Sequence, residues 1–379
     1  MDAYCMDAPA KAKVLGIKSC GGFSSCSKCW VVGKTIGNRR SYLAQTCRLR
    51  TQDDWEDERD ESLHVGPNCL LGIDGIDLSA QIVLDPLHLV CIGVVKKLLV
   101  DFWIEGKHKN KFAKLRASDI SAISSRLKLL KTEKHLARDF SNYPRSLDFV
   151  HKWKATEFRT FLLYIGPVVL ESILDTEAYE HFLRLHVAFT VLLSEILCVK
   201  ENIDVADEQL HIFADEFAGL YGNEYISHNV HGLIHTAKDA HRYGPLDNVS
   251  AFRFENHLGQ LVNLVNKPGM EVKQVVRRVY ERNQINFVAE NRKAPKKGFA
   301  LKHDRGPLCE GLSDPQYQLA RLPKFTIGTC RQGDRCFLMQ SGEVVAAVNF
   351  ATATNGSKKV VGREFGSKTD FYLKPLPSS

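Results

Sequence analysis

The longest apolar stretch of the chain covers residues 84–103, and hydrophobic side chains occupy almost every face of it. Asp85 and Pro86 stand at its start. An Asp side chain can accept hydrogen bonds from the amides of a first helical turn, and Pro at the first position loses only an N–H without a partner. We therefore predict a helix that is buried on most sides. His88 follows Asp85 by three positions, so both side chains can point the same way.

Apolar residues recur at helical spacing as far as residue 243. The pattern predicts long helices over 157–174 and 177–198, and a further helix that begins at a capping box over 204–207. Leu210, Phe213, Phe217 and Leu220 repeat at helical spacing after this box and are expected core positions. The region from 86 to 243 is therefore expected to be helical.

The pattern changes near the C-terminus. After a basic helix at 272–282 and a basic loop at 292–302, strand-like runs occupy 324–328, 335–339, 343–348 and 370–373 and are separated by turn residues. This pattern predicts a small β-domain, for which the sequence suggests no function.

Two acids stand at element boundaries. Residues 3–6 have the character of the end of a buried strand, and Asp7 then begins a short helix. An Asp where a strand gives way to a helix often faces a ligand in α/β folds, although local evidence alone favours a simple N-cap. Glu255 begins another helix, where the helix dipole alone favours an acid.

Cys26 and Cys29 have the spacing of a zinc knuckle, and Cys20 precedes them on a glycine-rich turn. His64, Cys47 or Cys69 could supply a fourth ligand. Three free thiols in a loop are the alternative, and a redox pair is disfavoured because no strand-to-helix context surrounds it. His231 and His235 lie one helical turn apart and are a possible metal pair, but buried histidines with hydrogen-bond partners are the preferred interpretation.

Composition narrows the class of protein. The 379 residues allow two or three domains, and a net charge of +7 permits nucleic-acid binding. We predict no signal peptide and no membrane span, and we interpret the 11 cysteines as reduced thiols or metal ligands in an intracellular protein.

A group of basic residues surrounds an aromatic residue at Arg145, Lys152, Trp153 and Lys154. Such a group could bind a phosphate or a base, although a packed loop with a buried Trp is the alternative.

Several of these motifs form an ordered series that covers nearly the whole chain. They are DAPAK at 7–11, the Cys20/Cys26/Cys29 cluster, LDPLHLV at 84–90, WKATEFR at 153–159 with YIGP at 164–167, and GPLDN at 244–248 leading to FEN at 254–256. The series resembles the transposase-derived proteins of the CACTA (En/Spm) group. The resemblance implies a ribonuclease-H-like core, with a large helical insertion before the last catalytic acid. Cys20 stands where relatives are expected to have His.

The resemblance also implies a catalytic site. Asp7 would match the second acid of a carboxylate triad and Glu255 the third, with Asp85 and His88 as the Asp-x-x-His signature between them. Such carboxylates hold two Mg²⁺ ions for DNA cleavage and strand transfer. The first acid lies well upstream of the second, and only six residues precede Asp7. We therefore expect an N-terminally truncated chain that is inactive alone.

The expected fold is α/β and mostly helical, with an incomplete ribonuclease-H-like core. Four domains are expected: a partial ribonuclease-H-like segment with the cysteine cluster at 1–80, a helical insertion at 81–245, return helices that complete the core at 246–295, and a small β-rich domain at 296–379. DNA is the expected partner, with a nuclear location, no membrane and a possible homo-oligomer. A non-catalytic protein that binds nucleic acid or other proteins is the alternative.

Overall fold

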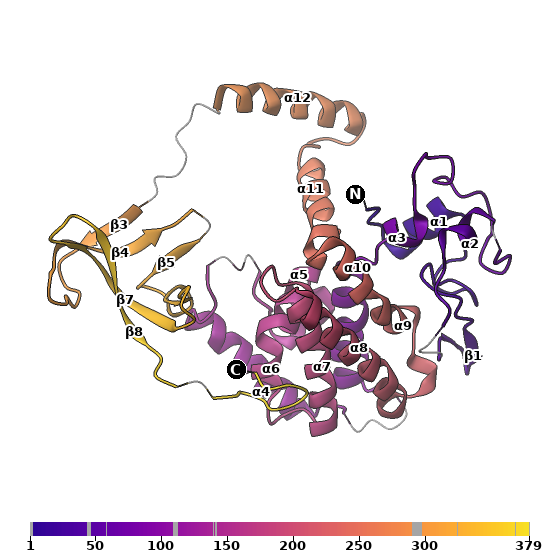
Figure 1. Ribbon diagram of the computed structural model, residues 1–379, viewed down its shortest axis with the longest axis horizontal. Helices are drawn as coiled ribbons and strands as arrows, with labels where there is room; N and C mark the ends of the chain where they lie inside the picture. Colours follow the sequence, from indigo (N-terminus) through magenta and orange to yellow (C-terminus); the bar gives the residue numbers. More distant parts are fainter. Residues whose placement is uncertain are drawn as a thin grey trace. The chain divides into compact units, whose positions relative to one another are not determined.

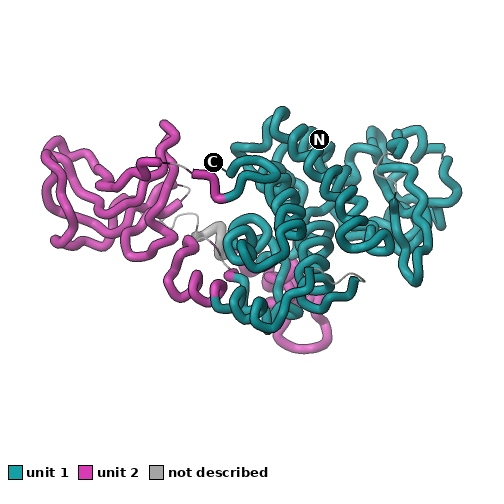
Figure 2. The backbone as a smooth tube through the Cα atoms, turned by 90° about the horizontal axis from the view of Figure 1, so that it is seen from below, with its two compact units in different colours: residues 1–125, 144–256, 372–378 teal, residues 126–143, 257–371, 379 magenta. Residues whose placement is uncertain are grey.

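The computed structural model describes residues 3–43, 47–57, 59–108, 113–138, 140, 142–289, 298–323, 325–367 and 369–378, with the backbone alone over 285–289. The chain divides into two compact units, coloured separately in Figure 2. The first comprises residues 1–125, 144–256 and 372–378, and the second comprises 126–143, 257–371 and 379. The fold is α/β: helices dominate the first unit, and an antiparallel sheet the second.

The first unit begins with a short parallel pairing. Tyr4 and Ile82 form an isolated parallel bridge, in which the Tyr4 N–H donates to Gln81 at 2.8 Å. The strand expected at 3–6 is reduced to this bridge. Helix α1 (Ala8–Leu15) follows at once, and Asp7 caps it by accepting the Ala10 N–H at 2.7 Å.

A small core supports this N-terminal segment. Its short elements are β1 (Lys34–Ile36), β2 (Arg39–Ser41), α2 (Gln52–Glu56) and α3 (Leu78–Gln81). Leu15 at the end of α1 packs with buried residues from the rest of the segment, namely Ile17, Trp55, Leu63, Leu70, Leu78 and Ile82. This packing fixes α1 beside the residues that precede Asp85.

The apolar stretch forms the predicted buried helix. It consists of two π-helical runs, η1 (Leu87–Val95) and η2 (Lys97–Ile104), and most of its side chains are buried. The helices around it, grouped in Figure 1, are α4 (Ala117–Thr132), α5 (Ala155–Thr160), η4 (Phe161–Ile165), α6 (Gly166–Leu170), α7 (Thr176–Leu192), α8 (Lys200–Tyr221), α9 (His228–Gly232) and α10 (Thr236–Tyr243). Shorter 3₁₀ turns are η3 (Leu147–Lys152), η5 (Asn223–Tyr225), η6 (Leu233–His235) and η7 (Leu246–Val249).

Helix boundaries differ from the sequence-based prediction in several places. The predicted helix over 157–174 already ends at Leu170. The predicted helix over 177–198 ends at Leu192. The capping box at 204–207 is wrong, because α8 already begins at Lys200 and both acids lie inside it. The buried face of α8 explains the earlier start: Ile203 and Ala206 continue the apolar repeat upstream of Leu210.

Helix α11 (Phe252–Val262) begins three residues before Glu255, where the sequence predicted its start, so Glu255 lies in its first turn. The Glu255 N–H donates to the Ala251 carbonyl oxygen at 2.9 Å. The helix ends at Val262, four residues before the end at Asn266 that the sequence pattern predicts. Helix α12 (Glu271–Ala289) extends the expected basic helix in both directions.

The second unit contains the β-structure. Its strands are β3 (Gly298–His303), β4 (Leu312–Arg321), β5 (Thr326–Gly328), β6 (Cys336–Leu338), β7 (Val344–Ala353) and β8 (Lys358–Glu364), with a 3₁₀ turn η8 (Gln332–Asp334). All pairings are antiparallel in the order β3-β4-β7-β6, with β5 also on β4 and β8 also on β7. Ala320, Ile327, Ala347 and Phe350 form its buried core.

Sequence patterns located three of these strands and missed three. Strands β3, β4 and β8 were missed because polar or charged residues occupy much of their length. The strand expected at 370–373 is absent: this segment is irregular with a bend at Phe371, and the Tyr372 ring lies edge-on to His186 in the first unit. The basic loop expected at 292–302 lies partly outside the described residues, and its end forms β3. None of the described helices combines the length and apolar character needed to cross a bilayer.

Candidate metal centre and acid cluster

Four buried side chains converge in the first unit, and we call them the Cys₂His₂ centre: Cys26, Cys29, His231 and His235. Each offers one donor atom, and all four atoms lie within 4.8 Å of one another. His231 Nε2 lies 3.3 Å from Cys29 Sγ and 3.3 Å from His235 Nε2. The centre therefore joins a loop near the N-terminus to histidines some 200 positions later.

The spacing of these atoms fits a tetrahedral metal site. Zn–N bonds of about 2.0–2.1 Å place two nitrogens of a tetrahedron about 3.4 Å apart, close to the separation of the two imidazoles. Two thiolates and two imidazoles are also a common donor set for structural zinc. The buried Cys₂His₂ centre can thus hold a metal ion such as zinc.

Local hydrogen bonds hold the cysteine loop in place. The Lys28 N–H donates to Cys26 Sγ at 3.4 Å, and Arg50 Nε donates to the Cys26 carbonyl oxygen at 3.0 Å. Arg50 also donates its backbone N–H to Lys28, and its guanidinium pairs with Asp60 at 2.7 Å. Arg50 and Asp60, which are not metal ligands, therefore help to fix the loop.

The histidines come from the helices α9 and η6. Ser227 caps α9, and the ring of Tyr42 stacks on His231 with centroids 6.0 Å apart. The pKa of the Cys26 thiol is lowered well below its usual value, first by a hydrogen bond from Cys29 and then by the two imidazoles. The same hydrogen bond, together with burial, raises the pKa of the Cys29 thiol, so Cys29 keeps the proton of the pair. A thiolate is the form that binds metal, so binding would require Cys29 to lose this proton.

The structure corrects the ligand set expected from the sequence. Cys26 and Cys29 are in the centre, but Cys20 is exposed and lies outside it. His64 packs its ring against Trp55 in the small N-terminal core. Cys47 packs against the Cys26–Cys29 cluster without joining the four, and Cys69 is exposed.

The histidine pair replaces the expected local ligand. The spacing of His231 and His235 allows a metal pair, but no Glu follows His231, so the sequence lacks the metalloprotease motif and favours ordinary buried histidines. No local signal links the two histidines to a cysteine loop 200 residues earlier. Their spacing of one helical turn was the available signal.

A second group of polar residues, here called the acid cluster, consists of Asp85, His88, Asp7 and Glu255. The buried Asp85 carboxylate accepts the Leu87 N–H at 3.1 Å, the His88 N–H at 3.2 Å and His88 Nδ1 at 2.5 Å. It also accepts the Ala251 N–H at 2.8 Å. Asp85 thus connects the start of η1 to the residue before α11.

His88 lies among three carboxylates. While Nδ1 bonds to Asp85, Nε2 lies 4.0 Å from Glu255 Oε1. The hydrogen bond to Asp85 is the main reason that the pKa of His88 is raised, and the negative charges of Asp7 and Glu255 add to the effect. The imidazole therefore brings together acids that are 248 positions apart in the sequence.

A small cavity adjoins this cluster. Its volume is about 30 Å³, and its lining includes Met6, Lys11, Leu84, Asp85 and His88. A cavity needs about 10–15 Å³ of such volume to hold a water molecule, so this one has room for water or a small ion. Burial of Asp85 raises its pKa, but the hydrogen bonds from His88 and the two backbone amides outweigh burial and lower the pKa below its usual value.

The expected nucleic-acid residues are placed differently. Trp153 is buried at 6% exposure against Phe158 and Phe161, so it cannot stack on a base. Arg145 donates two hydrogen bonds of 2.8 Å to the Glu157 carboxylate, which neutralises its charge. Lys152 and Lys154 remain exposed. The packed-loop interpretation is the one that fits Trp153 and Arg145.

Comparison with known proteins adds one match. The model of a family described as a domain of unknown function, DUF8592, matches residues 302–379. This range contains most of the β-structure and none of the residues of the Cys₂His₂ centre or the acid cluster. No curated protein and no solved structure matches the chain.

Proposed function

We propose that this chain is a transposase-like protein, and that the acid cluster is part of a ribonuclease-H-like site for metal-dependent cleavage of DNA. The observation that carries the proposal is the position of His88, which bonds to Asp85 and lies 4.0 Å from Glu255, with the charge of Asp7 close enough to raise its pKa. Helix caps alone give no reason for such a convergence.

The backbone near these residues supports the proposal. Tyr4 and Ile82 pair in parallel. Asp7 follows Tyr4 by three residues, and Asp85 follows Ile82 by three residues. Ligands in α/β folds bind beyond the carboxyl ends of parallel strands, where two such acids would meet. The parallel bridge supports the proposal because a ribonuclease-H-like sheet would also pair strands in parallel at this point.

The residues have distinct roles in this proposal. Asp7 and Glu255 would hold a divalent cation, because hard cations such as Mg²⁺ bind carboxylate oxygens. The cation would stabilise negative charge on a phosphodiester during cleavage. Asp85 and His88 are positioning residues: Asp85 orients the imidazole, and the imidazole faces Glu255.

Manganese binding to the purified chain tests the proposal. We expect one Mn²⁺ per chain in titrations followed by electron paramagnetic resonance. Loss of an outer partner of a metal ligand costs about 10–100-fold in affinity, so Asp7→Asn and Glu255→Gln should cost at least that much. Glu201→Gln is the matched control, because Glu201 is another exposed acid in a first helical turn. Equal affinity in all variants would remove the acid cluster from the proposal.

We expect no nicking or strand transfer by this chain alone in Mg²⁺ or Mn²⁺. The two-ion mechanism needs several carboxylates, and Asp85 is already committed to hydrogen bonds. Metal-dependent cleavage that disappears in Glu255→Gln would contradict this expectation. DNA binding without Mn²⁺ binding would favour the alternative, a non-catalytic nucleic-acid-binding protein. A nuclear location would follow from either role.

We also propose that the Cys₂His₂ centre holds a structural zinc ion. All four ligands come from the protein, which is typical of structural rather than catalytic zinc sites. The separations of 3.3 Å within the centre support this assignment.

A further inference from the structure

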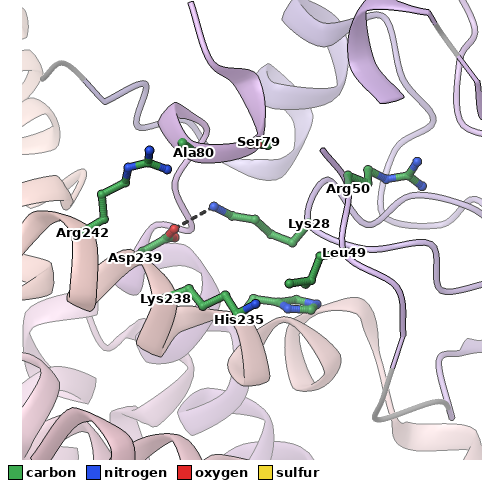
Figure 3. A pocket seen from close by; sticks show the side chains of 9 residues that line it. All are labelled: Lys28, Leu49, Arg50, Ser79, Ala80, His235, Lys238, Asp239 and Arg242. Atoms are coloured by element: carbon green, nitrogen blue, oxygen red, sulfur yellow. Dashed lines mark hydrogen bonds and ion pairs between the residues drawn. The ribbon is translucent and has the colours of Figure 1, made fainter. Parts of the chain in front are cut away.

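A second cavity, here called the basic cavity, lies beside the Cys₂His₂ centre (Figure 3). Its volume is about 180 Å³. Helix α10 contributes Lys238, Asp239 and Arg242, and the N-terminal segment contributes Lys28 and Arg50. His235, a member of the Cys₂His₂ centre, also lines it.

Positive charge prevails in this lining. Lys28 and Arg50 are buried, with side-chain exposures of 9% and 2%, whereas Lys238 and Arg242 are exposed on α10. Asp239 is the acid among the lining residues. The buried cations are therefore fixed, and the exposed cations are accessible from solvent.

The carboxylates nearby are already committed to partners. Asp239 accepts the Lys28 ammonium at 2.7 Å through one oxygen and the Leu84 N–H at 2.8 Å through the other. Asp60 pairs with Arg50 at 2.7 Å, and Asp77 approaches Arg242 at 3.5 Å. Lys238 forms no ion pair within 4 Å with a described residue, and its side chain lies beside His235 in Figure 3.

The Leu84 bond places the basic cavity close to the acid cluster. Leu84 lines the small cavity beside Asp85 and His88, and the same residue donates its N–H to Asp239 in the lining of the basic cavity. The bond between Leu84 and Asp239 thus connects the linings of the two cavities.

We infer that the basic cavity binds one phosphate group of a nucleic-acid backbone, beside the phosphodiester that the acid cluster would hold. The inference rests on the proposed function. A cavity of 180 Å³ is below the usual range of about 300–1,000 Å³ for drug-sized ligands and suits a single small anion. Lys and Arg are the side chains that bind phosphate, and two exposed cations one helical turn apart can contact neighbouring oxygens of one group.

DNA binding measured without added divalent cations tests this inference separately from the acid cluster. The measurement is the fluorescence anisotropy of a labelled DNA duplex across a series of salt concentrations. Each phosphate contact adds about 0.9 to the slope of log affinity against log salt, so Lys238→Gln and Arg242→Gln should each lower that slope by up to about 0.9. Lys128→Gln, at an exposed lysine of α4 outside the cavity, removes the same charge and should leave the slope unchanged.

Two further measurements make the result decisive. Circular dichroism and metal content show whether each variant keeps its fold, which we expect because both side chains are exposed. Inorganic phosphate, titrated by calorimetry into wild type and the Lys238→Gln/Arg242→Gln double variant, separates a free anion from a nucleic acid. Wild-type salt slopes in both cavity variants would overturn the inference. Phosphate binding that the double variant loses, with unchanged DNA binding, would also overturn it.

Failure of this inference and failure of the proposed function give different results. If Mn²⁺ binds through Asp7 and Glu255 but the cavity variants bind DNA as wild type does, the acid cluster stands and the phosphate site falls. If the cavity variants show the lowered salt slope while Mn²⁺ does not bind, the reverse holds.

Discussion

Asp85 illustrates what can be predicted for a single residue. Its position before Pro86 predicted a helix cap, and the carboxylate does accept the first amides of η1. Its bond to the Ala251 N–H, 166 positions away, has no local signal in the sequence. Sequence patterns depend on residues that are close together along the chain. This contact forms because the chain, after the helical region, comes back to the start of η1.

The Asp85–His88 pair should make stability depend on pH. The folded state raises the pKa of His88, mainly through its hydrogen bond to Asp85. A histidine with a higher pKa in the folded state than in the unfolded state stabilises the fold. This stabilisation is complete at pH values below the unfolded pKa of about 6.5 and is lost as the pH rises through the folded pKa. We therefore expect His88→Gln to lower the free energy of unfolding by about 1–2 kcal/mol more at pH 5.5 than at pH 9, because the substitution removes a charge-assisted hydrogen bond.

Urea unfolding of wild type and variant at both pH values measures this difference. His151→Gln is the control, because His151 is 63% exposed and lies 3.6 Å from its nearest carboxylate, so its substitution should cost little at either pH. An equal cost of His88→Gln at both pH values would show that the imidazolium does not stabilise the fold.

Among the elements, the cysteine loop and the α9–η6 segment form the Cys₂His₂ centre together. The Cys-x-x-Cys spacing predicted half of it correctly. The predicted fourth ligand was wrong because residues near the loop, such as His64, were expected, whereas the loop packs against a helix pair from much later in the chain. Burial of both histidines was expected, but their spacing did not show that both rings face the cysteine loop.

Metal analysis tests the centre at this scale. We expect one zinc per chain, retained in Cys20→Ser and lost in Cys26→Ser and His235→Ala, because only the last two remove ligands. A metal at 100 times its dissociation constant stabilises a fold by about 2.7 kcal/mol, so chelation should lower the thermal midpoint clearly. Zinc content that depends on Cys20 instead of His235 would restore the ligand set first expected.

For the whole molecule, hydrophobic periodicity predicted the helical region and the β-rich C-terminal part, because burial of a regular face leaves a regular pattern. It did not predict that residues 372–378 return to the first unit, or that the strand at 3–6 is a single bridge. Such outcomes depend on contacts between distant segments. The same limit explains why two acids at helix starts could be noted but not placed together from local pattern alone.

The two sites should be coupled. Asp7 precedes Cys26 by 19 positions, and Glu255 follows His235 by 20, so the metal centre joins both segments that carry the acids. Removal of zinc should therefore weaken Mn²⁺ binding at the acid cluster by about tenfold or more, as loss of supporting structure does at other metal sites. The comparison is Mn²⁺ affinity in Cys26→Ser and Cys20→Ser; equal affinities would show that the acids are held together without the centre.

The long separation of the ligands has a mechanical consequence. Cys29 and His231 are 202 positions apart, so a bound ion would close a loop that contains most of the helices. A force could be applied between the segment before Cys29 and the segment after His231. It would pass through the metal–ligand bonds and leave the loop between them unloaded. When those bonds rupture, the loop would release about 670–730 Å of contour length, at 3.3–3.6 Å per residue. In a single-molecule pulling experiment, the helical region would extend only after the ion had been lost.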